Sequence, residues 1–259
     1  MPNKTASSRF VFPRWVNYLL PVIVLGGIGG GLYLPVLVGF GFSADTLVVG
    51  YAPEQPVPFS HAIHAGELGM DCRYCHTTVE ETDFAAIPPT QTCINCHAPG
   101  DEAAGIKKQS ASLQPVHESH ETGQPIEWTM VHTMPDYVYF DHSAHVNRGV
   151  SCVECHGRVD TMDVVYRAES MSMSWCLECH RAPEKRLRPV EEVTNLAWDP
   201  REHLLANLDE YESGLTPEQR ERVDEISRSD AQLVIGEAVK QEYDIHDQMY
   251  MVSCSTCHR

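Results

Sequence analysis

The segment that decides the fold is "FSHAIHAGELGMDCRYCH" (Phe59–His76), which has a close counterpart in "FDHSAHVNRGVSCVECH" (Phe140–His156). Both segments read F-x-H-x-x-H, then a short spacer, then C-x-x-C-H. A second C-x-x-C-H follows each copy, beginning at Cys93 and at Cys176, so the corresponding cysteines are 80 and 83 residues apart. An internal repeat of this kind predicts two related structural modules.

All ten cysteines belong to five copies of C-x-x-C-H, which is the attachment signature of c-type haem. Zinc sites would not require a histidine after every second cysteine, thioredoxin-like chemistry needs one pair beside a βαβ unit, and disulfides give no reason for the spacing. The sequence therefore predicts five covalently attached haem c groups. Their attachment residues are Cys72, Cys75, Cys93, Cys96, Cys152, Cys155, Cys176, Cys179, Cys254 and Cys257, and their proximal iron ligands are His76, His97, His156, His180 and His258.

The remaining nine histidines have to supply the distal iron ligands. Each H-x-x-H pair lies on one face of a helix, because residues three apart are neighbours there, so each pair can reach two haems. The predicted distal ligands are His61, His64, His142 and His145, with His132 as the fifth, whereas His117, His120, His203 and His246 are not assigned to iron. Methionine is the competing ligand and would raise a haem's potential, and the candidates are Met162, Met173, Met249 and Met251.

The fifth motif, "CSTCH" at residues 254–258, has no F-x-H-x-x-H before it. Its distal ligand must therefore come from elsewhere in the chain. The candidates are His64, His145, Met249 and Met251.

Residues 15–44 carry no charge, a stretch longer than the roughly 20 apolar residues that span a bilayer. Lys4, Arg9 and Arg14 precede it and the next basic residue is Arg73, so the positive-inside rule places the N-terminus in the cytoplasm. A cleaved signal peptide is the alternative, but its apolar core is usually about 7–15 residues and no A-x-A-like site follows. We expect a single-pass inner-membrane protein whose haem domain lies in the periplasm.

The domain plan that follows has five parts: a cytoplasmic N-terminus (1–14), a transmembrane helix (15–42), a first dihaem module (43–139), a second dihaem module (140–190), and an acidic helical insertion with the fifth haem (191–259). Within the last part, "TPEQ" (216–219) has the capping residue, proline and glutamine that begin a helix. One apolar helix face should follow, and its residues are Val223, Ile226, Leu233, Ile235 and Val239. Few residues are available for each haem, too few for a large conventional core. The sequence therefore predicts a mainly α fold with extensive loops, in which the haems form the core.

The composition is acidic, with 36 Asp and Glu against 19 Lys and Arg and a formal charge of −17. This charge argues against nucleic-acid binding, for which a basic stripe is expected. It suits a positively charged protein partner, or it serves solubility alone.

The F-x-H-x-x-H and C-x-x-C-H arrangement resembles the cytochrome c3 and c7 superfamily. That resemblance implies that His61 ligates the haem on Cys72 and Cys75, that His142 ligates the haem on Cys152 and Cys155, and that the second histidine of each pair serves another haem. The stretches "IPPTQTCINCH", "PDYVYFDHSAHVNRGVSCVECHGRVDTM" and "MSMSWCLECHR", behind a single anchor, further resemble the pentahaem cytochrome subunit of alternative complex III. The likeness extends over about Pro58 to Pro189.

The second resemblance implies a subunit of a membrane quinol:electron-acceptor oxidoreductase that relays electrons on the periplasmic side and has no catalytic site of its own. The implied partners are an iron–sulfur/molybdopterin-like subunit, integral quinol-oxidising membrane subunits, other cytochrome c subunits, and a soluble electron carrier or terminal oxidase. The main alternative is a membrane-anchored multihaem quinol dehydrogenase of the NapC/NrfH kind. A nitrite-reductase-type enzyme fits less well, because it needs one haem with an open axial position and all five motifs end in histidine. A third possibility is the cytochrome subunit of a photosynthetic reaction centre or of another molybdopterin oxidoreductase.

Overall fold

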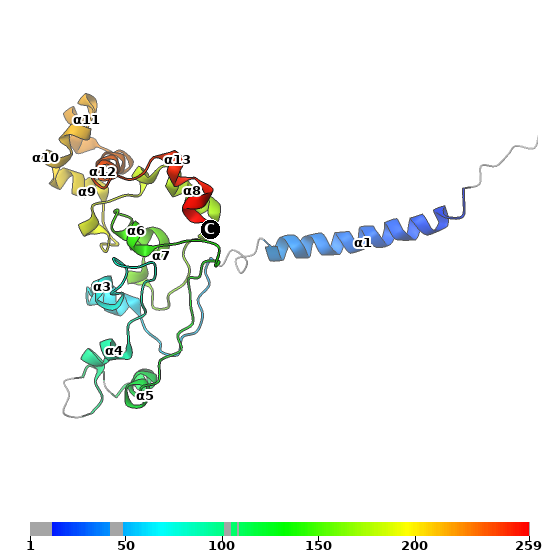
Figure 1. Cartoon of the computed structure of the whole chain (residues 1–259), viewed down its shortest axis with the longest axis horizontal. Coiled ribbons are helices and arrows are strands. Elements are labelled where there is room, and N and C mark those ends of the chain that lie inside the picture. Colours follow the sequence, from blue (N-terminus) through cyan, green and yellow to red (C-terminus); the bar gives the residue numbers. More distant parts are fainter. Residues whose placement is uncertain (1–11, 42–48, 101–104, 108, 259) are drawn as a thin grey trace, which may run out of the picture. The chain divides into compact units, whose positions relative to one another are not determined.

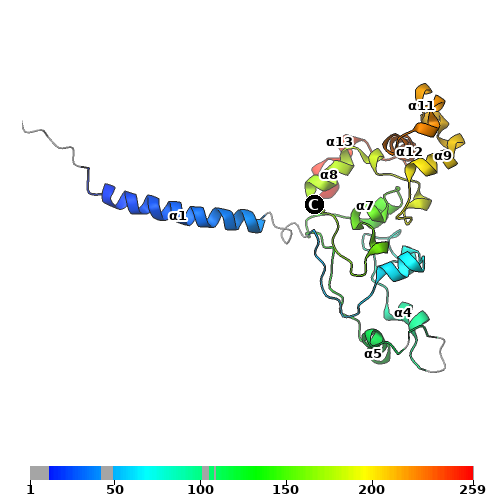
Figure 2. The ribbon, with the colours of Figure 1, turned by 180° about the vertical axis from the view of Figure 1, so that it is seen from behind.

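The computed structural model describes residues 12–41, 49–100, 105–107 and 109–258. The chain forms two compact units, residues 1–47 and residues 48–259 (Figures 1 and 2). Described residues form helices and loops and make only two isolated β-bridges, Val138 with His258 and Val150 with Leu187. The prediction of a mainly α fold with extensive loops is confirmed.

The first unit contains one long helix, α1 (Val16–Gly41). Its segment Val16–Gly39 has a mean hydropathy of 2.0, and none of it is buried within the structure. The helix is therefore long and apolar enough to cross a membrane, although a signal sequence near the N-terminus would have the same properties. Most of the predicted cytoplasmic N-terminus, including Lys4 and Arg9, lies outside the described residues.

The second unit begins with the haem motifs, each carried on a short helix. In the first module a side chain caps the motif helix: Asp71 accepts a hydrogen bond from the backbone N–H of Arg73, which satisfies one of the free donors at a helix start. The elements of this part are η1 (Ala62–Glu67), α3 (Cys72–Cys75), α4 (Thr90–His97), η2 (Ala111–Leu113) and α5 (Gln114–Thr122).

The second module repeats this plan with its own capping residues. Asp141, Ser151 and Ser172 each accept a backbone hydrogen bond at the start of the helix that follows them. The elements are α6 (His142–Val146), α7 (Cys152–His156), η3 (Val159–Thr161) and α8 (Met173–Arg181).

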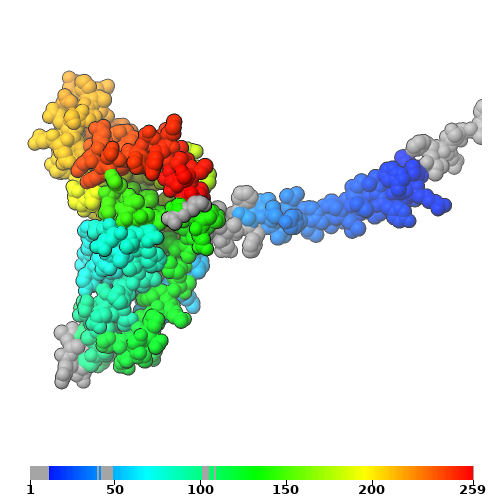
Figure 3. Space-filling view, viewed as in Figure 1, coloured from blue at the N-terminus to red at the C-terminus, as the bar shows by residue number. Residues whose placement is uncertain are grey.

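The two modules contact each other through equivalent residues. The backbone N–H of Ser143, in the second H-x-x-H helix, donates to Thr82 O at 3.1 Å, and the N–H of Ala62, at the same place in the first, donates to Met162 O at 3.0 Å. Each module thus uses the loop after its own first haem motif to hold the other module's H-x-x-H helix. In the space-filling view the cyan segment of the first module lies directly against the green atoms above it (Figure 3).

The rest of the second unit is a group of short helices and one longer one. They are η4 (Pro183–Lys185), η5 (Val190–Glu192), α9 (Pro200–Ala206), α10 (Leu208–Tyr211), η6 (Glu212–Gly214), α11 (Pro217–Glu221), η7 (Val223–Glu225), α12 (Arg228–Glu242), α13 (Gln248–Met251) and α14 (Cys254–Cys257).

The predicted helix start at Thr216 is confirmed, because Thr216 and Gln219 form a reciprocal capping box. The prediction of one continuous helix is wrong. α11 ends at Glu221, and Ser227 starts α12 by accepting a hydrogen bond from the N–H of Asp230. This second cap resets the helical phase, so Val234 is buried while Leu233, predicted on the apolar face, is 38% exposed.

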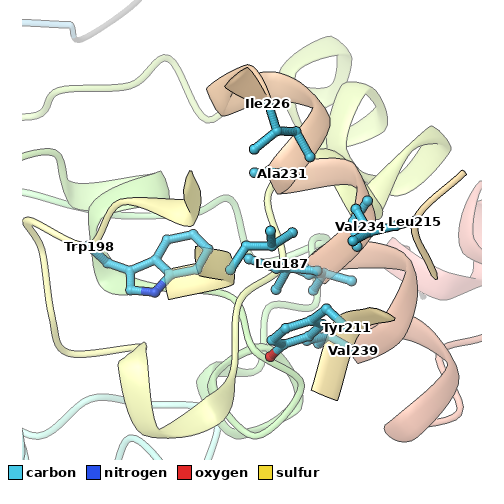
Figure 4. Packing of buried hydrophobic residues seen from close by; sticks show 10 residues of the cluster. Leu187, Trp198, Tyr211, Leu215, Ile226, Ala231, Val234 and Val239 are labelled. Carbon is cyan, nitrogen blue, oxygen red and sulfur yellow. The ribbon is translucent and has the colours of Figure 1, made fainter. Parts of the chain in front are cut away.

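A conventional hydrophobic core lies in this C-terminal part, which the expectation of haems as the core did not include. α12 packs on η4 and α9, and the buried cluster between them is shown in Figure 4. Its members are Leu187, Trp198, Leu204, Tyr211, Leu215, Ile226, Ala231, Val234, Ile235 and Val239. Around the first module the corresponding cluster contains only Val57, Ile94 and Val116 at its centre. The described residues around the haem motifs therefore bury little apolar surface of their own, as a fold that packs around porphyrins requires.

Candidate haem-binding sites

The ten cysteines are not paired in disulfides, and they lie at the positions where a c-type cytochrome has thioether sulfurs. Within each motif the two cysteines lie one helical turn apart. Among the described residues, no group of three or more His, Cys, Asp or Glu side chains is arranged to hold a bare metal ion. This arrangement fits haem attachment and gives no support to zinc binding.

Most of the predicted iron-ligating histidines share one hydrogen-bonding pattern, in which Nδ1 faces a backbone carbonyl. Because a carbonyl oxygen can only accept, Nδ1 carries the proton and Nε2 keeps its lone pair for a metal. The Nδ1 partners are Ser60 O for His64 (2.8 Å), Ala86 O for His76 (2.9 Å), Ile106 O for His97 (2.7 Å), Asp83 O for His142 (2.8 Å), Asp141 O for His145 (2.7 Å), Met251 O for His180 (2.9 Å) and Tyr137 O for His258 (3.2 Å).

Two of the histidines without a predicted ligand role, His117 and His203, are oriented differently. His117 places Nε2 2.8 Å from the carbonyl oxygen of His97, and His203 places Nε2 3.3 Å from the hydroxyl of Tyr211. In both rings the nitrogen that would bind iron is already engaged. This supports leaving them out of the ligand set.

Three motif histidines face a histidine from an H-x-x-H pair at the separation that an iron would impose. A metal–imidazole bond is about 2 Å long, so two rings on opposite sides of one metal have centres about 6 Å apart. The observed ring-centre distances are 6.2 Å for His64 and His97, 6.4 Å for His142 and His156, and 6.2 Å for His145 and His180. The geometry thus supports His142 as the ligand implied by the resemblance, and it pairs His64 and His145 with the second motif of their own modules.

His61 and His132 each have a buried ring nitrogen without a hydrogen-bonding partner, Nδ1 in His61 and Nε2 in His132. Burial lowers the pKa of both rings to about 4; His76 lowers that of His61 further, and Arg167 that of His132. Both imidazoles are therefore neutral near pH 7, as metal ligation requires. An unpaired buried polar atom costs about 1–3 kcal/mol, so a missing partner such as a haem iron fits the Nε2 of His132.

His132 is a predicted distal ligand, but the sequence does not assign it to a particular haem. Its ring is edge-on to His156 with the centres 4.5 Å apart, which is too close for an iron between them. The structure therefore brings His132 to the third motif, beside the His142–His156 pair.

The fifth motif docks on the segment that precedes the second module. Tyr139 donates its N–H to Cys257 O at 2.8 Å, Val138 bridges to His258, and the rings of Tyr137 and His258 lie 5.9 Å apart.

Of the methionine alternatives, Met162 is buried, whereas Met173 and Met249 are exposed by 66% and 83%. Met251 uses its carbonyl to hold His180.

The thiols of successive motifs lie close enough to influence one another. Burial and then the neighbouring Cys93 thiol raise the pKa of Cys75, and a hydrogen bond from one thiol to the other lowers the pKa of Cys72 to about 7 and raises that of Cys152. The first motif therefore lies between the second motif and the third.

The series continues on the other side of the third motif. Burial, followed by the Cys179 thiol, raises the pKa of Cys155 to about 12, and burial and then Cys257 raise that of Cys176. Neighbouring thiols thus link the five motifs in the order second, first, third, fourth, fifth.

Replacing His64 by alanine should convert one haem from low spin to high spin and let it bind cyanide, because its iron loses the ring opposite His97. The matched control is His117→Ala, since His117 bonds a carbonyl through Nε2 and should leave all haems low spin. EPR and absorption spectra of the two variants make the comparison. A high-spin signal in the His117 variant, or none in the His64 variant, would contradict the ligand set.

One group of polar residues near these sites has no counterpart in the sequence predictions. Glu154, inside the third motif, pairs with Arg186 and Arg188 at 3.0 Å each. The signal that was available is the C-x-E-C-H form of the third and fourth motifs followed by "RLR" at residues 186–188.

Two family models match the chain, and both describe multihaem cytochromes. Residues 44–127 match the class III cytochrome c family, and residues 138–196 match cytochrome c7 and related cytochromes c. A similar protein is the multihaem cytochrome c subunit of the menaquinone reductase of Nitratidesulfovibrio vulgaris, 34% identical over 123 residues. That match covers 48% of this chain, and the chain spans only 55% of the relative's length. These matches support the predicted c3/c7-like multihaem cytochrome fold, and they indicate covalently bound haem c.

Proposed function

We propose that this chain is the electron-transfer subunit of a membrane quinol:electron-acceptor oxidoreductase and relays electrons through five haem c groups on the periplasmic side. The observation that carries the proposal is the series of motifs, in which the cysteine side chains of neighbouring motifs lie close enough to influence each other. Haem attached at these cysteines supplies one-electron redox chemistry. A relay needs such groups in series, and the chain positions its attachment sites in series.

At three of the five predicted sites the chain's own residues would hold a haem from both sides and leave no position for a substrate. Three ring pairs have the separation of two axial ligands, and backbone carbonyls fix most of the ligand rings through Nδ1. An iron held between two imidazoles has no open axial position. This supports an electron carrier without a catalytic site of its own.

The complex that we propose is alternative complex III, on the sequence resemblance and the single apolar helix. In it α1 would anchor the chain with the N-terminus in the cytoplasm, beside an iron–sulfur/molybdopterin-like subunit, integral quinol-oxidising subunits and further cytochrome c subunits. Electrons would leave to a soluble carrier or a terminal oxidase. A second candidate is a quinone-reducing complex with electrons flowing the other way, which the likeness to the menaquinone reductase subunit favours.

The purified haem-loaded chain should accept electrons from a reductant but should not oxidise a quinol analogue in steady state. The reason is that quinol oxidation would belong to a partner subunit. The measurement is quinol-dependent reduction of an added acceptor by the isolated chain and by the complex purified through a tag on this chain. Sustained turnover by the isolated chain would favour a NapC/NrfH-like dehydrogenase instead.

The same purified complex separates the two candidate directions. Alternative complex III should oxidise menaquinol or ubiquinol with a high-potential acceptor and contain the polytopic quinol-oxidising subunits. A complex that instead reduces quinone with electrons from a periplasmic donor would support the quinone-reducing candidate.

A further inference from the structure

The first and third haem motifs occupy equivalent positions about a local twofold arrangement. The side chains of Cys72 and Cys152, equivalent in the repeat, lie next to each other. The reciprocal bonds of Ala62 and Ser143 extend the same relation to the H-x-x-H helices. Two haems attached here with the same kinds of ligand would have similar reduction potentials unless their surroundings differ.

The surroundings of the third motif contain one partly buried charge, Glu154, whose side chain is 18% exposed, and one buried charge, Arg188. Glu154 accepts hydrogen bonds at 3.0 Å from Arg188 and at 3.0 Å from Arg186. Arg188 is only 5% exposed, donates to Asn195 O at 3.0 Å and lies 4.7 Å over the ring of Trp198. Burial lowers the pKa of the Arg188 guanidinium, and the adjacent carboxylate of Glu154 opposes that shift, so Arg188 stays charged.

The first motif has no such buried group at the equivalent position. Tyr74 stands where the third motif has Glu154, and its side chain is exposed. The charges nearby are Arg73, Asp71 and Glu80, whose side chains are 40–43% exposed and therefore screened by solvent. The charge difference between the two equivalent sites thus comes mainly from Glu154 and Arg188.

We propose that Glu154 and Arg188 set the difference in reduction potential between the haem on Cys152 and Cys155 and the haem on Cys72 and Cys75. Reduction adds one electron, and so one negative charge, to an iron. A partly buried carboxylate nearby opposes that addition, and a buried guanidinium favours it. At an effective dielectric constant of ~20, a unit charge about 10 Å away changes the equilibrium constant for reduction by roughly tenfold.

This inference rests on the proposed relay and adds to it. In a row of haems, the difference in reduction potential between two neighbours decides which of them holds the electron at equilibrium. Neither Glu154 nor Arg188 is a predicted iron ligand. Glu154 lies in the motif helix and Arg188 pairs with it, so both would act on the iron through their charges.

The test is a redox titration of the full-length haem-loaded protein in detergent, followed by EPR. Glu154→Gln keeps the size of the side chain and an oxygen that can accept from the arginines, but removes the negative charge. The reduction potential of one low-spin haem signal should rise, by an amount that corresponds to an about tenfold larger equilibrium constant for reduction. Arg188→Gln should move the same component to lower potential.

The fourth motif supplies a matched control. Glu178 occupies the same motif position as Glu154, but its side chain is 72% exposed and lies 3.8 Å from Arg186. Glu178→Gln should therefore leave every component close to its original potential. The variant His142→Met identifies the haem of the third motif, because His/Met ligation raises its potential and alters its EPR signal.

Opposite shifts of the third-motif component in the Glu154 and Arg188 variants support the proposal. No shift, a shift equal to that of Glu178→Gln, or shifts of the same sign would overturn it. These outcomes are independent of the proposed function, which fails if the isolated chain turns over quinol, whereas the potentials are measured on the chain alone.

Discussion

Replacing both Cys152 and Cys155 by alanine is expected to remove one haem and to divide the relay into two halves. The third motif lies between the first and the fourth, through the contacts of Cys72 with Cys152 and of Cys155 with Cys179. Without it, the haems of the second and first motifs have no close neighbour among those of the fourth and fifth. The pyridine haemochrome assay should show four haems in place of five.

Electron transfer should show the division more strongly than the haem count does. After photoreduction of one haem, redistribution across the whole chain should be lost in the Cys152/Cys155 variant, and each half should equilibrate by itself. The control is the Cys254→Ala and Cys257→Ala variant, which also loses one haem but leaves the other four in an unbroken line. Fast redistribution in the Cys152/Cys155 variant would contradict the serial order, and an unchanged haem count would contradict the attachment sites.

Gly236→Ala should destabilise the C-terminal part by about 3 kcal/mol or prevent its folding. A Cβ at this position would lie 1.8 Å from the carbonyl oxygen of Glu184 and 2.6 Å from its carbonyl carbon. These are backbone atoms of η4, against which α12 packs, so neither side can move without opening the core. At an exposed helix position the same change would stabilise by up to about 1 kcal/mol, so the expected sign itself tests the packing.

Thermal or urea unfolding followed by far-UV circular dichroism measures this effect. Glu237→Ala is the control, because Glu237 is the next residue of α12 and its side chain is 51% exposed. It should change the free energy of unfolding by less than about 0.5 kcal/mol. If Gly236→Ala were as stable as Glu237→Ala, the contact between α12 and η4 would have to be looser than the structure shows.

Local signals in the sequence predicted the starts of helices better than their ends. The capping box at Thr216 involves residues three apart, so the sequence alone displays it. The end of α11 depends on a second cap, Ser227, which competes with continuation of the helix. Periodicity without that cap placed Leu233 in the core, whereas the restarted helix buries Val234.

The candidate sites show the same division between local and distant information. The motifs and the H-x-x-H pairs are short patterns, so all ten attachment cysteines and four distal histidines could be proposed from spacing. Which motif each histidine faces depends on distant backbone atoms, such as Asp83 O for His142 and Met251 O for His180. His132, placed by its position before the second module, lies beside His156 for reasons that spacing does not contain.

The reciprocal contacts between the two modules have a consequence for how the chain arose. Contacts in which residue i of one copy meets residue j of the other, and j meets i, are what a symmetric homodimer has at its interface. The pairs Ser143 with Thr82 and Ala62 with Met162 have this form, and Cys72 meets its own equivalent, Cys152. A dihaem ancestor that paired with itself would give this arrangement after gene duplication and fusion, and the fusion would make the pairing independent of protein concentration. It would also let each half change its sequence independently of the other. Glu154 illustrates this, because the equivalent position of the first module holds Tyr74.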